Sequence, residues 1–343
     1  MFAGNALITK IKSLYALRIQ PEDYEVLLKK RSLSELTAYL KTLPNYRDIL
    51  MGINESMVHR DRLEEQIKKN HFSLMMKLIR FIKMKDEDFY RIHVVAKEHD
   101  VILSVVKSFI SDESYDVVAQ LPVFFDKYSR LDILKMSQST NLSELVESLK
   151  NTPYYALLVP YENIKNENIN FFLIESVLEN EYYKHVFKQI DKFYKGKTKV
   201  ELSEMFKSRI EVANIIKIYR LKKFYRLDND AIEGMLIPQF SRIDQQKIHE
   251  VLQMQNPQDI FNLLAHSKYA QYIDQNDHVY LEYYDEYIKY YEAKKNIYYA
   301  KHPAKVFLAY LMLNEIEMSN LIHLIEGIRY QVSDKEVRMM LVY

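Results

Sequence analysis

Few residues in this sequence have the types and spacing that catalysis or metal binding requires. The segment Gly196-Lys197-Thr198 is the only candidate for a phosphate-binding loop. That loop needs another glycine five residues before Gly196, and the residue at that position is Asp191. Ten histidines occur, but none forms a pair three or four residues apart; His93 and His99 are six apart, which places them on different faces of a helix. These patterns predict neither a nucleotide site nor a zinc site.

The carboxylates and the lack of cysteine are equally restrictive. Asp228 and Asp230 resemble the start of a calcium-binding loop, but the later ligands and the terminal Glu are missing, so we interpret the segment as a solvated linker. The chain has no cysteine, which excludes disulfides, thiolate metal sites and a thiol nucleophile. The remaining carboxylates lie among lysines on amphipathic faces. We therefore predict no catalytic residue, no cofactor-binding residue, no metal ligand and no bound cofactor.

A capped helix start recurs along the chain and indicates how its elements are organised. Its copies span residues 32–41, 141–150 and 256–265, and each begins with a side chain that can cap a helix, followed three residues later by an acid. The copies start 109 and 115 residues apart, a spacing nearer to a small domain than to a solenoid repeat. We predict three related helical subdomains, at residues 1–115, 116–232 and 233–343.

A second motif supports this division. The pattern Glu211-x-x-Asn214-Ile215-x-x-Ile218 recurs as Glu317-x-x-Asn320-Leu321-x-x-Leu324, late in the second and third subdomains. The apolar spacing of three and four residues predicts that both lie on one face of a helix. Long helices are predicted at about residues 57–84, 89–110, 168–194, 202–225, 277–300 and 306–330.

Composition favours an all-α protein. Only 5 glycines and 8 prolines occur in 343 residues, too few for the turns of a β-rich or Rossmann-type fold. The 48 basic and 47 acidic residues nearly balance, which argues against a nucleic-acid partner. No stretch approaches the ~20 apolar residues that span a bilayer. Lys10 and Lys12 interrupt the first apolar run, so we predict no signal peptide and a soluble, cytoplasmic chain.

Two segments resemble the C subunit of the V/A-type ATPases, whose counterpart in the eukaryotic vacuolar enzyme is the d subunit. The first runs from Asp23-Tyr24-Glu25-Val26-Leu27-Leu28 to Ser34-Glu35-Leu36-x-x-Tyr39-Leu40. The second is Ala309-Tyr310-Leu311-x-x-x-Glu315-x-Glu317-x-x-Asn320-Leu321-x-x-Leu324-Ile325-Glu326-Gly327. The similarity extends over essentially the full chain in length and helical layout.

The resemblance implies three similar helical units around a pseudo-threefold axis, forming a funnel. It implies a non-catalytic subunit of the central rotor at the cytoplasmic face of the membrane, as a peripheral component of the complex. Its partners would be the central-stalk subunits and the membrane proteolipid ring, between which it would transmit torque for proton or sodium transport. The isolated chain is expected to be a monomer, because internal repetition would close the funnel.

Two other classes of function remain open from the residues. One is an all-α tandem-repeat adaptor or scaffold unrelated to ion transport, which would not associate with a proteolipid ring. The other is an all-α enzyme with an unrecognised carboxylate site, which would lose turnover but not assembly when clustered acids are replaced.

Overall fold

The computed structural model describes residues 2–82, 84–111, 121, 125–256, 259–260, 262 and 281–343. Every regular element among these residues is a helix, so the predicted all-α fold is confirmed. The described residues up to Lys85 and from residue 281 onward form one compact unit, and those from Asp86 to residue 262 form a second. We describe each unit by itself.

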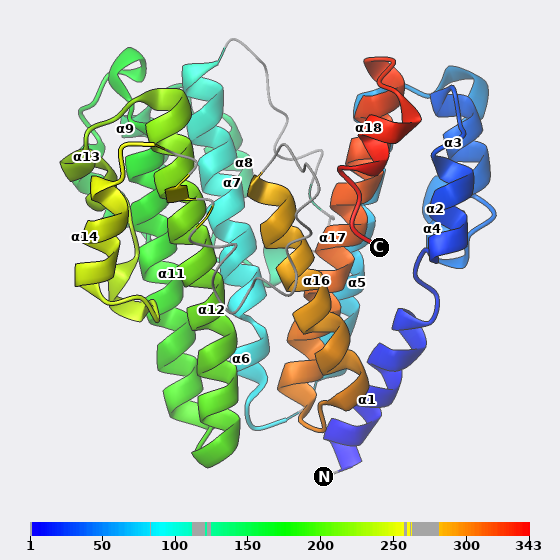
Figure 1. Ribbon diagram of the computed structural model, residues 1–343, viewed down its shortest axis with the longest axis horizontal. Helices are drawn as coiled ribbons and strands as arrows, with labels where there is room; N and C mark the ends of the chain where they lie inside the picture. The colour runs from blue at the N-terminus through cyan, green and yellow to red at the C-terminus, as the bar shows by residue number, and fades with distance from the viewer. Residues whose placement is uncertain are drawn as a thin grey trace. The chain divides into compact units, whose positions relative to one another are not determined.

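The first unit is built around helix α17, which packs against α16, α1 and α5 (Figure 1). Residues 306–314 of α17 are all buried, because all of them except Asn314 are apolar and neighbouring helices surround them. Short helices from both ends of the chain pack on the second half of α17. The helices of this unit are α1 (Phe2–Tyr15), α2 (Pro21–Leu27), α3 (Leu33–Leu40), α4 (Pro44–Leu50), η1 (Glu55–Met57), α5 (Arg60–Phe81), α16 (Leu281–Tyr299), α17 (Pro303–Arg329) and α18 (Asp334–Arg338).

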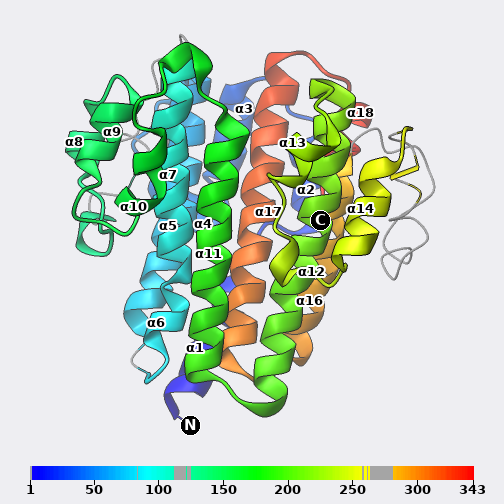
Figure 2. The same ribbon diagram turned by 90° about the vertical axis from the view of Figure 1, so that its left-hand side faces the viewer.

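The second unit is built around helix α11, which lies beside α7 and α12 (Figures 1 and 2). The short elements that precede and follow the long helices in the chain pack against them. These helices are α6 (Glu87–Tyr90), α7 (Ile92–Ile110), η2 (Phe125–Lys127), α8 (Ile133–Ser137), α9 (Leu142–Ser148), α10 (Tyr155–Leu158), η3 (Val159–Tyr161), η4 (Asn166–Asn168), α11 (Phe171–Phe193), α12 (Gly196–Arg220), the π-helical turn η5 (Leu221–Tyr225), α13 (Asn229–Glu233), η6 (Pro238–Phe240) and α14 (Gln245–Gln253).

The recurring helix start has the same geometry in its first two copies. The side chain of Ser32 accepts the N–H of Glu35 at 3.2 Å, and that of Asn141 accepts the N–H of Glu144 at 3.0 Å. Each glutamate in turn accepts the N–H of the residue before the cap, at 2.9 and 2.7 Å. The predicted caps of these two copies are therefore confirmed. The third copy, residues 256–265, lies largely outside the described residues, and the division into three subdomains stays a prediction.

Two polar segments have clear structural roles. Gly196 adopts a φ of +55°, a value that favours glycine, and begins α12, so the Gly196-Lys197-Thr198 segment forms the start of this helix just after α11. Helix α12 thus begins earlier than the predicted residue 202. Asp228 is not simply part of a solvated linker, because its side chain accepts the N–H of Ala231 at 2.7 Å and caps α13.

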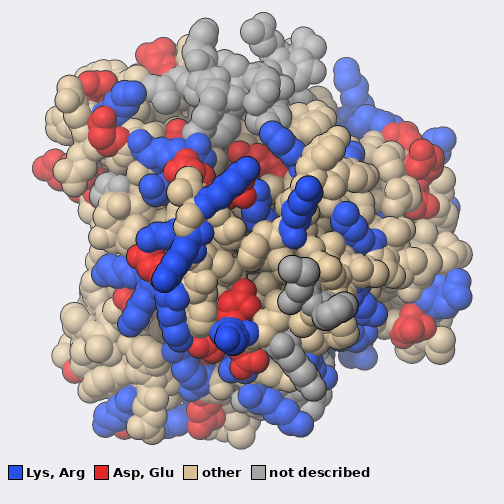
Figure 3. Space-filling view, turned by 90° about the horizontal axis from the view of Figure 1, so that it is seen from below, with Lys and Arg blue, Asp and Glu red and all other residues tan. Residues whose placement is uncertain are grey.

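The surface carries charges of both signs. Figure 3 shows one face on which Lys and Arg side chains lie among Asp, Glu and uncharged residues. Many of these charges are paired along helices, as with Lys69 and Glu65 at 2.7 Å. None of the helices in the described ranges is long and apolar enough to cross a membrane.

The contact between α17 and α18 leaves no room for a side chain at Gly327. A Cβ atom there would lie 2.5 Å from Cγ2 of Val337. We expect Gly327→Ala to lower the free energy of unfolding by about 1–3 kcal/mol, because overpacking displaces α18. Urea unfolding followed by circular dichroism measures the change.

Two further variants make this prediction specific. Val337→Ala in the Gly327→Ala chain should restore part of the loss, because it removes the clashing methyl groups. Gly52→Ala is the control, since its added Cβ would meet no heavy atom within 4 Å. Equal losses at Gly327 and Gly52 would contradict the steric explanation.

Candidate functional site

Two glutamates are buried in the middle of long helices. Glu317 of α17 is 1% exposed and Glu98 of α7 is 0% exposed. Because an ionised carboxylate is costly to remove from water, such a residue needs a charged partner and several hydrogen-bond donors. Each glutamate has a complete set of such partners, and these two clusters are the strongest candidates for a built site in the described residues.

In the first unit, Glu317 binds an arginine, a tyrosine and a backbone N–H. Nε of Arg18 lies 2.9 Å from Glu317 Oε2, and the N–H of Ile19 donates to the same oxygen at 3.2 Å. The hydroxyl of Tyr46 donates to Oε1 at 2.8 Å. Arg18 also donates from Nη2 to the carbonyl oxygen of Leu313 at 2.7 Å, so both charged groups are held at α17.

In the second unit, Glu98 has the same kinds of partner. Nη2 of Arg130 donates to Glu98 Oε2 at 2.8 Å, and the backbone N–H of Arg130 donates to Oε1 at 2.5 Å. The hydroxyl of Tyr154 donates to Oε2 and accepts a bond from Arg130 Nη2 at 3.0 Å. Ser129 adds a hydroxyl donor at 3.0 Å. We call each of these arrangements an Arg–Glu–Tyr lock.

A looser pair of the same kind joins α12 to the segment before α14. Nε of Arg242 lies 3.5 Å from Glu211 Oε2 and 3.4 Å from Glu204 Oε2. Arg242 also donates to the carbonyl oxygen of Glu204 at 3.0 Å. Two carboxylates share one guanidinium here, and both are more exposed than Glu98 and Glu317.

The spacing of the three arginines is a signal in the sequence that our predictions missed. Arg18, Arg130 and Arg242 are each 112 residues apart, and an aliphatic residue follows each one. Two positions after Arg130 and Arg242 stands an aspartate that caps a short helix: Asp132 caps α8 and Asp244 caps α14. The sequence singled out two of the three partner glutamates, because Glu211 and Glu317 belong to the repeated Glu-x-x-Asn motif. Glu98 does not belong to it.

The electrostatics of the lock in the first unit favour a fixed ion pair. Burial raises the pKa of Glu317 above its usual range, and the charge of Arg18 with the bonds from Tyr46 and Ile19 offsets only part of that rise. Burial and the neighbouring Glu317 raise the pKa of Tyr46 well above its usual range, which keeps the hydroxyl protonated as a donor. With donors on both oxygens, Glu317 acts as an anchor between helices, and the arrangement offers no open position for acid–base chemistry.

The asparagines of the second motif form a pair of equivalent backbone clamps. Asn320 Nδ2 donates to the carbonyl oxygen of Val342 at 2.8 Å, and Val342 N donates to Asn320 Oδ1 at 2.9 Å. Asn214 makes the same two bonds with Ile237, at 3.1 and 3.0 Å. The sequence echo between these two helices therefore corresponds to one repeated interaction.

The two histidines on α7, His93 and His99, are buried. His93 and His99 are 7% and 6% exposed on α7, and the ring of His99 packs edge-on against Tyr154 with centroids 5.2 Å apart. Among the residues that the structure describes, no three or more His, Asp and Glu side chains are grouped so that they could hold a metal ion. Asp228 caps a helix, and Asp230 lies exposed beside it.

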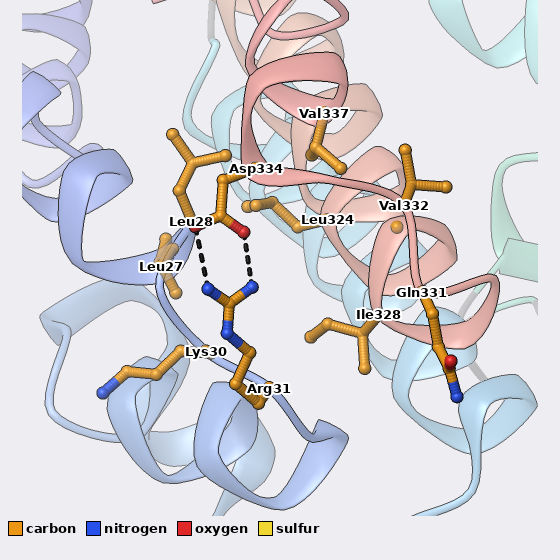
Figure 4. Close-up of a pocket in the computed structure, with 11 residues that line it drawn as sticks. Leu27, Leu28, Lys30, Arg31, Leu324, Ile328, Gln331, Val332, Asp334 and Val337 are labelled. Carbon is orange, nitrogen blue, oxygen red and sulfur yellow. Dashed lines mark hydrogen bonds and ion pairs between the residues drawn. The ribbon is translucent and has the colours of Figure 1, made fainter.

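A small pocket of about 150 Å³ lies between α2, α17 and α18 (Figure 4). An ion pair between Arg31 and Asp334 crosses it, with Arg31 Nη2 3.0 Å from Asp334 Oδ2. The ion pair ties the loop after α2 to the start of α18. The apolar lining of the pocket consists of Leu27, Leu28, Leu324, Ile328, Val332 and Val337.

Comparison with known protein families identifies the family of this chain. The family model described as ATP synthase (C/AC39) subunit matches residues 7–340, which is nearly the whole chain. The chain belongs to the ATP synthase (C/AC39) subunit family. The predicted resemblance to the C subunit of the V/A-type ATPases is thereby confirmed.

Curated relatives of this C/AC39 chain have a consistent name. The A-type ATP synthase C subunit of Methanosarcina mazei is 22% identical over 232 residues, which cover 67% of this chain and 62% of the relative. The A-type ATP synthase C subunit of Methanosphaera stadtmanae is 24% identical over 196 residues, which cover 54% of this chain and 50% of the relative. The matched part thus spans between half and two thirds of the length of these relatives.

The Glu317 lock and the looser Arg242 pair of the C/AC39 chain should differ in their contribution to stability. We expect Glu317→Ala to lower the free energy of unfolding by about 3–5 kcal/mol, because it leaves the Arg18 guanidinium buried without a counter-ion. Glu211→Ala should cost no more than about 1 kcal/mol, because Arg242 keeps Glu204 and is partly exposed. Urea unfolding at pH 7 measures both, and losses of similar size would contradict the assignment of Glu317 as an anchor.

Burial of His99 should make the second unit sensitive to acid. Burial lowers the pKa of His99 to about 4, with Arg130 and His185 acting in the same direction and Glu98 in the opposite one. The unfolded chain therefore binds the proton first, and stability should fall as the pH drops from about 6.5 to about 4. Between pH 7 and pH 5, His99→Phe should lose about 2 kcal/mol less than the unmodified chain.

The control for this pH dependence is His249 on α14, whose side chain is exposed. His249→Phe should follow the unmodified chain, because it replaces a side chain that is exposed and not one that is buried. Urea midpoints at pH 7, 6 and 5 provide the comparison. Parallel losses in all three chains would show that His99 is not the sensitive group.

Proposed function

We propose that this chain is a non-catalytic part of the central rotor of a V/A-type rotary ATPase. It sits at the cytoplasmic face of the membrane and links the central-stalk subunits to the proteolipid ring. In that position it transmits torque for proton or sodium transport, while ATP is hydrolysed or made by other subunits. Membership of the C/AC39 family and the names of the curated relatives support this assignment.

The observation that best supports the proposal is that each arginine pairs with a glutamate from a different predicted subdomain. Arg130, in the second predicted subdomain, binds Glu98 of the first. Arg242, in the third, pairs with Glu211 of the second. Arg18, in the first, binds Glu317 of the third, so the series returns to its start. This order supports the interpretation of residues 1–115, 116–232 and 233–343 as three equivalent subdomains.

A torque-carrying part must resist deformation, and the described helices are suited to that task. Helices α5, α11, α12 and α17 have 22, 23, 25 and 27 residues. At 1.5 Å per residue, α17 is about 40 Å long. Buried ion pairs and asparagine clamps fix the short helices to these long ones. We expect each stable contact with stalk or ring to bury about 1,200–2,000 Å² in total.

Removal of this chain from the complex tests the proposal. ATP hydrolysis should persist in a detached soluble head, and ATP-driven ion pumping should disappear. The two activities are measured as phosphate release and as acidification or sodium uptake in membrane vesicles. The returned chain should restore pumping.

Two results would contradict the proposed function. Pumping that persists without the chain would show that it carries no torque. Failure of the chain to co-purify with a proteolipid ring would favour an adaptor unrelated to ion transport.

A further inference from the structure

The pocket between α2, α17 and α18 has an aliphatic interior (Figure 4). Four of the side chains that line it are at most 5% exposed: Leu27, Leu28, Leu324 and Val337. The volume of the pocket is about 150 Å³. A cavity of roughly this volume with an aliphatic lining accepts a molecule of the size of benzene. The pocket therefore has room for an apolar group of about six carbon atoms.

The charged groups of the lining favour an anion. Lys30 and Arg31 contribute two positive charges, and Asp334 contributes one negative charge. Nζ of Lys30 lies 5.3 Å from the centroid of the Tyr39 ring, so Arg31 is the cation that faces the pocket (Figure 4). One positive charge remains after the ion pair is formed, and it attracts a negatively charged ligand.

The ion pair of Arg31 with Asp334 shows which anion the guanidinium accepts. Both Nη atoms of Arg31 bind the carboxylate, one to each oxygen, with Nη2 3.0 Å from Oδ2. This forked geometry suits a planar carboxylate. The two side chains are 69% and 39% exposed, and an ion pair that is so exposed contributes little to stability. A second carboxylate can therefore replace Asp334 at small cost if its tail also buries apolar surface.

We propose that this pocket binds a short-chain monocarboxylate of about six carbon atoms. The carboxylate of the ligand takes the place of Asp334 on Arg31, and the alkyl tail lies among the aliphatic side chains. Burial of the tail provides the affinity, and Arg31 selects the anion over a neutral molecule of the same length. All lining residues belong to the first unit, so this unit contains the whole site.

Titration of the full chain with sodium hexanoate at pH 7 and constant ionic strength tests the site. NMR signals of the Leu324 and Val337 methyl groups should shift, because both side chains line the pocket. We expect a dissociation constant of about 1 mM for a ligand of this size. Hexanol has the tail without the charge and acetate has the charge without the tail, so each should bind about fivefold more weakly or less.

Two variants that remove the same ion pair separate ligand binding from a structural role. Arg31→Gln should weaken hexanoate binding about fivefold, because the ligand loses its cation. Asp334→Asn should strengthen it about fivefold, because the competing carboxylate is gone. A purely structural ion pair would change binding in the same direction in both variants.

Arg338→Gln is the matched control. Arg338 of α18 forms another exposed ion pair with Glu25 of α2, with Nη2 2.6 Å from Glu25 Oε2, and neither residue lines the pocket. This variant removes one positive charge, as Arg31→Gln does, and should leave hexanoate binding unchanged. Circular dichroism spectra equal to that of the unmodified chain show that the variants are folded.

Three results would overturn the proposed site. The Leu324 and Val337 methyl signals could stay in place at hexanoate concentrations far above the expected dissociation constant. Hexanol could bind as tightly as hexanoate, which would exclude Arg31 from recognition. Arg31→Gln and Asp334→Asn could also weaken binding equally. Because the isolated chain suffices for every measurement, the outcome is independent of the proposed rotor function.

Discussion

The constraint on which the rest of the structure depends is the burial of a carboxylate in the middle of a long helix. An ionised Glu317 or Glu98 removed from water needs compensation from charge and from several donors at once. Each obtains an arginine, a tyrosine hydroxyl and a backbone N–H. The backbone donor matters most for architecture, because it fixes the path of the chain at Ile19 or Arg130 and so places the short helices that follow.

The asparagine clamps complete this fixation with neutral groups. Asn214 and Asn320 each satisfy both polar atoms of one buried peptide residue, so the chain after a long helix returns to that same helix. Buried charges and amides are better at specifying one arrangement than at adding net stability, because their desolvation offsets much of the attraction.

The asparagine clamps allow the irregular ends of α12 and α17 to be compared residue by residue. Because the clamps define equivalent positions, the π-helical turn after α12 is recognisable as one inserted residue. The insertion adds a second exposed ring, Phe224, beside Tyr225, where α17 has Tyr330 alone. Local strain at Arg226 and Gln331 is maintained by the surrounding bonds at positions where the rings face solvent.

The sequence by itself determined the class of fold, the starts of the capped helices and the echo between Asn214 and Asn320. These features are local, since scarce glycine, apolar spacing and a cap followed by an acid act within a few residues. The same is true of the family resemblance, which follows spaced positions such as Glu317 and Asn320.

Only the tertiary structure decided which polar residues meet. Arg18 and Glu317 are 299 positions apart, and nothing in the sequence spacing around them shows that these two residues meet. The left-handed turns at Arg226 and Gln331 were equally hidden, because neither residue type favours that conformation. The physical reason is that burial, and with it the value of a charge or the cost of a strained turn, is set by how distant helices pack.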